Sequence, residues 1–183
     1  MMRDAPEHGE HPTGLAAVRL LLLTGFRRQE ALGLHRDWIN DEQGFIRFPD
    51  TKTDGQVRVI GRTAAKLIET QPKRDNSPYV FPADWGGGHF TAMVATLDRL
   101  CADARLKDVT PHTLRHTFAS VAGDLRFSEL TIKSLLGHAA RGVTQRYVHV
   151  DEAVRLAADR VSTEIDRLLE GRPPPSSIQQ PHR

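Results

Sequence analysis

The segment GLAAVRLLLLTGFRRQEALGL, residues 14–34, holds the longest apolar run of the chain and is therefore expected to form the centre of its core. Residues 14–24 are apolar on most faces, which predicts a buried helix. Gly25 interrupts the pattern, a second helical piece runs on from Phe26, and Gly33 is expected to end it. The stretch therefore predicts two consecutive helices with a glycine break between them.

The pattern after residue 36 changes to short segments that favour strands. These segments are DWIN (37–40), GFIRF (44–48) and QVRVI (56–60). The last two are separated by PDTKTDG (49–55), in which Asp54-Gly55 is a strong signal for a hairpin turn. We expect a small three-stranded antiparallel sheet.

The rest of the chain has mainly helical patterns. Thr63 is a plausible N-cap for a helix over residues 64–70, which Pro72 would close. The segment NSPYVFPADWGGG (76–88) is typical of a loop. Further helices are expected near residues 90–105, 111–123, 128–136, 141–148 and 151–169. The expected fold class is therefore mainly α (α+β), with one small sheet near the N-terminal side.

At 183 residues, the chain is long enough for one well-buried domain. We expect a flexible segment over residues 1–13, one folded domain over 14–169 and a disordered tail over 170–183, where three prolines follow one another. No apolar run approaches the roughly 20 residues of a membrane span, and no secretory signal is readable. Cys101 is the only cysteine, which excludes an internal disulfide and favours a reducing, cytoplasmic location.

The distribution of charge is more informative than the net charge of +2. Residues 105–146 contain seven Lys or Arg against three Asp or Glu, whereas residues 151–170 contain three against six. A basic middle beside an acidic end permits a DNA-facing surface. An ordinary solvated surface explains the same charges equally well.

Arg27 lies at the break between the first two helices, near the edge of the core. Glu30 follows three residues later on the same helical face, where its carboxylate can hold the guanidinium in one orientation. The alternative is a surface ion pair that contributes less than about 1 kcal/mol.

The segment HTLRH carries a second group of polar side chains. His112 and Arg115 share one helical face, while Leu114 is expected on the opposite, buried face. The spacing of His112 and His116 also suits two zinc ligands. This metal site lacks a carboxylate after the first histidine and would place Arg115 beside the ion, so we do not favour it.

Three further residues are informative only in combination. Lys52 lies near the tip of the expected hairpin, where a lysine is usually just solvated. His138 follows Gly137 at the end of a helix, a position that also suits a histidine interacting with the helix dipole. Tyr147, nine residues later, is by itself also compatible with an ordinary amphipathic surface tyrosine.

Taken together and in order, these segments resemble the catalytic domain of the tyrosine recombinases, the phage integrase family. TGFRRQEALGL resembles the first arginine box, TKT the hairpin lysine, HTLRHTFAS the His-x-x-Arg box, and LLGH and TQRYVHV the boxes of the second histidine and the nucleophile. The resemblance spans residues 15 to about 168. It fills all six active-site positions with Arg27, Lys52, His112, Arg115, His138 and Tyr147, and leaves Glu30 and His116 as supporting residues.

The resemblance implies DNA strand cleavage and rejoining through a 3′-phosphotyrosine on Tyr147, without metal or nucleotide cofactor. Arg27, Arg115 and His138 would stabilise the charge on the phosphate. His112 is the candidate that takes the proton of the tyrosine, and Lys52 would protonate the departing 5′-oxygen.

The family acts on double-stranded DNA as a homo-tetramer. The apolar stripe of helix 151–169, which comprises Val154, Ala157, Val161, Ile165 and Leu168, would then dock on a neighbouring protomer. Packing of the stripe on its own domain is the alternative.

Full-length relatives place a helical DNA-clamping domain before the region that begins here near residue 14. Without that domain we expect DNA binding to be severely weakened, and strand cleavage by this chain alone to be weakened with it. The alternatives are a non-catalytic DNA-binding remnant, a type IB topoisomerase and a zinc hydrolase that uses the histidines.

Overall fold

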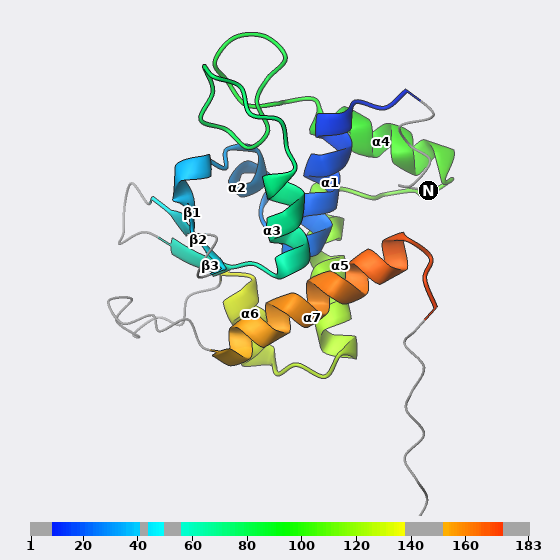
Figure 1. The fold of residues 1–183 in the computed structure, drawn as a ribbon. Coiled ribbons are helices and arrows are strands. Elements are labelled where there is room, and N and C mark those ends of the chain that lie inside the picture. Colours follow the sequence, from blue (N-terminus) through cyan, green and yellow to red (C-terminus); the bar gives the residue numbers. More distant parts are fainter. Residues whose placement is uncertain (1–8, 41–43, 50–55, 138–151, 174–183) are drawn as a thin grey trace, which may run out of the picture.

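The structure, a computed structural model, describes residues 9–40, 44–49, 56–137 and 152–173 (Figure 1). Within these residues, helices surround a central helix α1, and a small sheet lies at one side. None of the described helices combines the length and the hydropathy needed to cross a membrane. The expected fold class, mainly α with a small antiparallel sheet, is confirmed.

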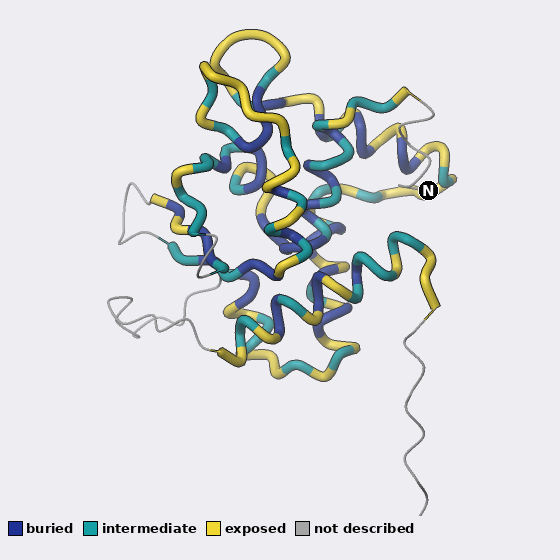
Figure 2. Tube along the Cα trace, in the orientation of Figure 1, coloured by how far each residue is buried: buried dark blue, intermediate teal, exposed yellow. Residues whose placement is uncertain are grey.

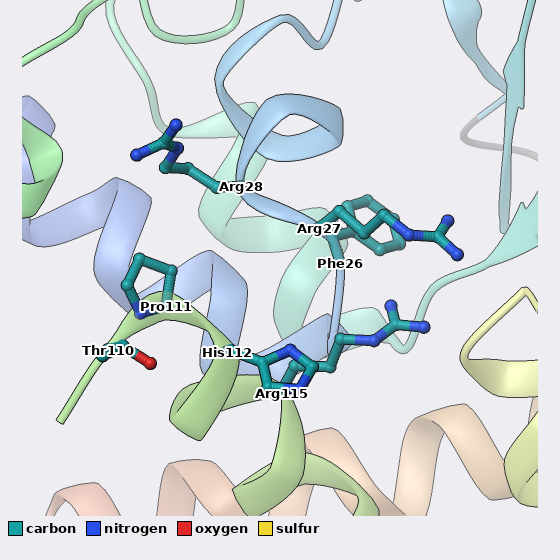
Figure 3. Close-up of a pocket in the computed structure, with 7 residues that line it drawn as sticks. All are labelled: Phe26, Arg27, Arg28, Thr110, Pro111, His112 and Arg115. Atoms are coloured by element: carbon teal, nitrogen blue, oxygen red, sulfur yellow. The ribbon is translucent and has the colours of Figure 1, made fainter. Parts of the chain in front are cut away.

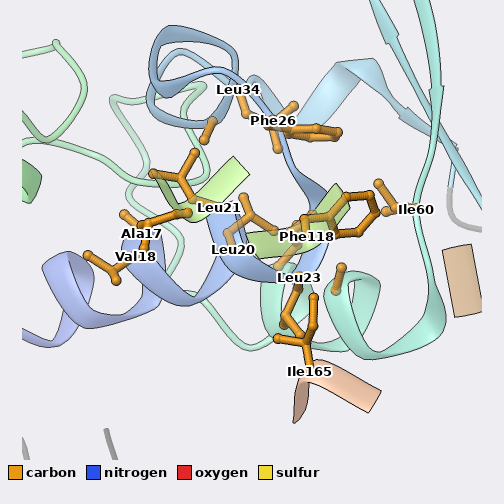
Figure 4. Packing of buried hydrophobic residues seen from close by; sticks show 14 of the residues in the cluster. Ala17, Val18, Leu20, Leu21, Leu23, Phe26, Leu34, Ile60, Phe118 and Ile165 are labelled. Carbon is orange, nitrogen blue, oxygen red and sulfur yellow. The ribbon is translucent and has the colours of Figure 1, made fainter. Parts of the chain in front are cut away.

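Helix α1 (Pro12–Thr24) is the centre of the core (Figure 4). It contacts α3, α4, α5 and α7, and the side chains of Leu20 and Leu21 are completely buried. Gly25 ends the helix with a φ of 62°, and a Cβ there would lie 2.7 Å from the ring of Phe118. The predicted break at Gly25 is confirmed, and only glycine fits it without strain.

The second helix and the sheet follow directly. Helix α2 (Arg28–Leu32) ends at Gly33, as predicted. Strands β1 (Ile39–Asn40), β2 (Phe45–Phe48) and β3 (Gln56–Val59) form an antiparallel sheet in the order β1-β2-β3. A 3-10 turn (Arg36–Trp38) precedes β1. The three predicted strands are all present, each slightly shorter than expected.

Helix α3 (Arg62–Glu69) begins two residues earlier than predicted. The prediction that Thr63 is its N-cap is wrong, because the cap position is Gly61. The backbone N–H of Arg62 donates to Oδ1 of Asp159 at 2.6 Å, so a carboxylate from another helix satisfies the first turn. Such a tertiary cap leaves no signal in the local sequence.

The remaining helices agree with their predicted positions to within three residues. They are α4 (Met93–Asp103), α5 (Pro111–Asp124), α6 (Glu129–Leu135) and α7 (Glu152–Leu169). Thr110 caps α5 by accepting from the backbone N–H of Thr113, and Pro111 occupies the first helical position. The predicted helix at 141–148 lies outside the described residues.

Helix α7 packs across α1, α3, α5 and α6 of its own domain (Figures 1 and 2). Of its apolar stripe, Ala157, Val161 and Ile165 are buried, whereas Leu168 is about half exposed. In the single chain these three residues of the stripe therefore complete the core of their own domain, as the alternative interpretation expects, and docking on a neighbouring protomer stays a prediction.

Residues at both edges of the expected domain also contact it. Glu10 accepts from Nε of Arg99 at 2.6 Å, and the ring of His11 stacks on Phe90. At the other end, Nη2 of Arg172 donates to Asp166 at 2.8 Å. The packed domain thus includes a few residues that the sequence had assigned to the two tails.

Candidate active site

A pocket of about 310 Å³ lies where the break after α1 meets the first turn of α5 (Figure 3). Two segments far apart in the sequence line it. The described residues of its wall are Phe26, Arg27 and Arg28 from one segment and Thr110, Pro111, His112 and Arg115 from the other. The fold thus brings together the two arginine segments that the sequence analysis singled out.

Arg27 and Glu30 form the predicted pair, and the pair is built into the start of α2. Nη1 of Arg27 donates to Oε1 of Glu30 at 2.7 Å. The backbone N–H of Arg27 donates to Oε2 of the same carboxylate at 2.8 Å. Arg27 precedes the helix and Glu30 is its third residue, so the carboxylate both caps the helix and holds the guanidinium. The side chain of Arg27 is 53% exposed, so its charge is available at the pocket.

Arg115 reaches the same pocket from α5, but its side chain is buried. Nη1 donates to the carbonyl oxygen of Gly25 at 2.5 Å, and Nη2 donates to that of Leu136 at 2.8 Å. Burial lowers the pKa of Arg115, the nearby charge of Arg27 lowers it further, and Glu30 opposes both. Figure 3 shows the guanidiniums of Arg27 and Arg115 directed to the same side of the pocket.

His112 is exposed in the first turn of α5 and lines the pocket. His116 is exposed one turn later, and its ring lies edge-on to that of His112 with 4.3 Å between the centroids. Among the described residues, His116 is not part of the pocket wall. The described residues contain no group of three or more His, Cys, Asp or Glu that could hold a metal ion.

Arg58 is a residue that the sequence analysis missed. It lies on β3 with an exposed fraction of 0%, and Nη1 approaches Oε2 of Glu30 at 3.2 Å. Burial lowers the pKa of Arg58 to about 10, an effect that Glu30 partly offsets. In QVRVI, alternation of apolar and polar residues would place the two valines in the core and the arginine in solvent. The local pattern therefore gave no indication that Arg58 is buried.

Three of the predicted site residues, Lys52, His138 and Tyr147, lie outside the described residues. The residue before His138 is described. Gly137 has a φ of 68°, and its carbonyl oxygen accepts from Nε2 of Gln56 on β3 at 2.5 Å. The end of α6 is therefore fixed against β3, the strand that follows the predicted hairpin turn.

The charges at the site favour an anion. Arg27, Arg58 and Arg115 influence one another electrostatically, and Glu30 is the carboxylate among them. These four side chains carry more positive than negative charge. Guanidiniums bind phosphate oxygens through planar, paired N–H donors and keep their charge at any working pH, so the pocket is suited to a phosphate group.

Comparison with known proteins identifies the family. Residues 4–153 match the phage integrase family. The chain belongs to this family. It is 32% identical over 167 residues to "Tyrosine recombinase XerD" of Brucella suis biovar 1 (strain 1330), a match that covers 81% of this chain and 53% of the relative. The XerD of Corynebacterium glutamicum is 28% identical, with 82% and 54% covered. The chain thus spans about half the length of these relatives.

Solved structures of integrases and recombinases share the fold. The integrase of mycobacterium phage Brujita superposes with a TM-score of 0.66 at 15% identity, covering 85% of this chain and 57% of the other. XerA recombinase gives a TM-score of 0.61 at 23% identity, covering 95% and 62%. XerH recombinase, bound to its difH substrate in a pre-cleavage complex, gives 0.60 at 19% identity, covering 98% and 50%.

Proposed function

We propose that this chain carries out site-specific DNA recombination by cleaving and rejoining DNA strands through a 3′-phosphotyrosine intermediate. The observation that carries the proposal is the convergence of Arg27 and Arg115 on one pocket, together with His112, in a member of the phage integrase family. Relatives are named tyrosine recombinases, and one solved neighbour is bound to a DNA substrate. We take residues 14–169 as the catalytic domain and double-stranded DNA as the substrate.

The role of the two arginines follows from the charge of the phosphodiester. A phosphodiester repels nucleophiles, and attack on phosphorus requires donors fixed around the non-bridging oxygens. Arg115 is pre-positioned by two backbone carbonyls, and Arg27 by Glu30. Donors that are already oriented need no rearrangement as charge develops. Each is expected to contribute about 3 to 4 kcal/mol in the transition state.

The cleavage step uses Tyr147 as nucleophile. Its hydroxyl oxygen forms a bond to phosphorus, and the bond from phosphorus to the 5′-oxygen breaks. His112 takes the phenol proton, Lys52 gives a proton to the departing 5′-oxygen, and His138 adds a third donor to the phosphate. A 5′-hydroxyl from another strand then attacks the phosphotyrosine, so the bond energy is retained and rejoining needs no nucleotide.

A nicked duplex that loses a short fragment after cleavage tests this proposal, because the loss traps the covalent intermediate. The chain is expected to form a protein–DNA adduct on denaturing gels, and Tyr147→Phe is expected to form none. Adduct formation by Tyr147→Phe would refute the nucleophile. DNA binding without any adduct from either protein would favour a non-catalytic DNA-binding protein instead.

Recombination and relaxation of supercoils need separate assays, because a type IB topoisomerase would form the same phosphotyrosine adduct. A recombinase passes strands between two duplexes, and a homo-tetramer on DNA is the assembly that we propose for this step. Light scattering of the chain with a duplex that carries two binding sites measures the assembly. A monomer that relaxes supercoiled plasmid and exchanges no strands would favour the topoisomerase alternative.

A further inference from the structure

Arg58 is a buried cation at the junction of three parts of the site. Nη1 lies 3.2 Å from Oε2 of Glu30, and Nη2 donates to the carbonyl oxygen of Leu135 at 2.8 Å. The guanidinium also lies 4.8 Å from the centroid of the Phe26 ring. Phe26 belongs to the pocket wall, and Leu135 is the last residue of α6. Arg58 therefore connects β3 to the pocket wall that contains Phe26 and to the end of α6.

Full burial of a guanidinium is unfavourable unless its charge is well paired, and an apolar side chain could fill the same space at a lower desolvation cost. The neighbours on β3, Val57 and Val59, are apolar and only partly buried. The sheet thus directs the charged residue inward and leaves the valines nearer the surface. A strand that only stabilised the core would be expected to have the opposite arrangement.

The surroundings of Arg58 make it a rigid support. Three successive carbonyl oxygens at the end of α6 each accept a side-chain hydrogen bond: Leu135 from Arg58, Leu136 from Arg115 and Gly137 from Gln56. A Cβ on Gly137 would lie 2.5 Å from Nη1 of Arg58, so the glycine lets the backbone close over the guanidinium. Arg58 has little room to move.

Arg27 differs in this respect, because its side chain is more than half exposed and it contacts the rest of the site through Glu30. Glu30 is 15% exposed and accepts from both arginines with one carboxylate. A long exposed side chain has many rotamers, and a fixed partner is needed to select one. The contacts therefore form a series: the carbonyl of Leu135 on α6 binds Arg58, Arg58 binds Glu30, and Glu30 binds Arg27.

We propose that Arg58 is a positioning residue for strand cleavage: anchored on Leu135 and Phe26, its guanidinium fixes the carboxylate of Glu30, which in turn holds Arg27 at the scissile phosphate. The catalytic part of this inference rests on the proposed function. The positioning part concerns the free protein and can be tested without DNA.

The test uses Arg58→Met, which retains a long side chain and removes the charge and the donors. Arg36→Met is the matched control. Arg36 also donates to backbone carbonyls, those of Gln71 and Pro72, its pKa is likewise lowered by burial, and it does not line the pocket. Thermal unfolding reports the structural effect of each substitution. Arg58→Lys, which keeps a cation at the same site, replaces Arg58→Met if that variant does not fold.

The first readout is nitrogen-15 relaxation of the Nε–H group of Arg27 in the protein without DNA. Arg58→Met is expected to lower the order parameter of Arg27 below 0.6, the range of flexible groups, and Arg36→Met to leave it unchanged. Arg58→Lys is expected to give an intermediate order parameter, between the values for Arg58→Met and Arg36→Met. An order parameter that the loss of Arg58 does not change overturns the proposal, whether or not the chain cleaves DNA.

The second readout is the rate of adduct formation at saturating DNA. Arg58→Met is expected to slow cleavage by about 10- to 100-fold, as a small misplacement of a catalytic group does, with little change in DNA affinity. In an Arg27→Ala background, the same substitution is expected to slow it less than threefold, because its effect passes through Arg27. Equal effects in both backgrounds would assign Arg58 a purely structural role. No adduct from the unaltered chain would refute the proposed function and leave the relaxation result to decide.

Discussion

The two walls of the pocket hold their arginines in different ways. On the α5 wall, Arg115 is buried and donates to two backbone carbonyls. On the wall formed by the start of α2, Arg27 is 53% exposed and is held by a carboxylate. One guanidinium is thus part of the core, and the other is supported by a series of charged side chains. Loss of Arg115 is therefore expected to destabilise the fold, whereas loss of Arg27 is expected to leave the free energy of unfolding almost unchanged.

The largest expected effect is that of Arg115→Ala, which should impair both activity and folding. Cleavage is expected to fall by about two to three orders of magnitude, as for loss of one oxyanion donor. The carbonyls of Gly25 and Leu136 would lose their guanidinium partner, which is expected to lower the free energy of unfolding by about 1 to 3 kcal/mol. Adduct kinetics and urea unfolding measure the two effects separately. Unchanged stability would mean that Arg115 is not part of the core.

Arg27→Ala is expected to slow cleavage by a similar two to three orders of magnitude and to leave stability almost unchanged. Its ion pair with Glu30 is largely solvent-exposed on the arginine side, and such pairs contribute less than about 1 kcal/mol. The same two measurements apply. A loss of cleavage below tenfold would mean that Arg27 does not contact the phosphate. A large loss of stability would mean that Arg27, like Arg115, is part of the core.

The difference between the walls also separates what the sequence could predict from what it could not. Local signals were sufficient for α1, its break at Gly25, the three strands and the Arg27–Glu30 pair, because each depends on neighbours in the chain. The shared helical face of His112 and Arg115 followed from helical spacing alone.

Contacts between distant segments had no local signal. Asp159 rather than Thr63 caps α3, because the carboxylate comes from a helix almost a hundred residues away in the sequence. Arg58 is buried although a charged residue on a strand is expected on the exposed face, because Glu30 and the end of α6 provide its partners. The sequence therefore singled out Arg27, His112 and Arg115, which the fold brings to one pocket, and missed the buried Arg58 beside them.

Arg28 lies at the edge of the pocket, on the same wall as Arg27. It is exposed, it lines the pocket, and Figure 3 shows its guanidinium directed away from that of Arg27. A cation in this place is expected to contact the DNA backbone beside the scissile phosphate without assisting the chemistry. Arg28→Ala should weaken DNA binding similarly for all sequences and reduce the slope of log affinity against log salt by about 1. Fluorescence anisotropy at several salt concentrations measures this slope. A normal slope with slow cleavage would instead place Arg28 at the reacting phosphate.

The smallest effect is expected for His116→Ala, which tests how far the functional surface of the α5 wall extends. The ring of His116 contacts that of His112 at its edge, and both side chains are exposed. An exposed ring contact supplies little orientation, so we expect cleavage to slow less than threefold and stability to change by less than about 0.5 kcal/mol. His112→Ala is the paired variant, and its loss of a general base is expected to slow cleavage by about 100-fold or more. If both substitutions had equal effects, the two imidazoles would act as one unit, and the functional surface of this wall would extend a full helical turn beyond the pocket.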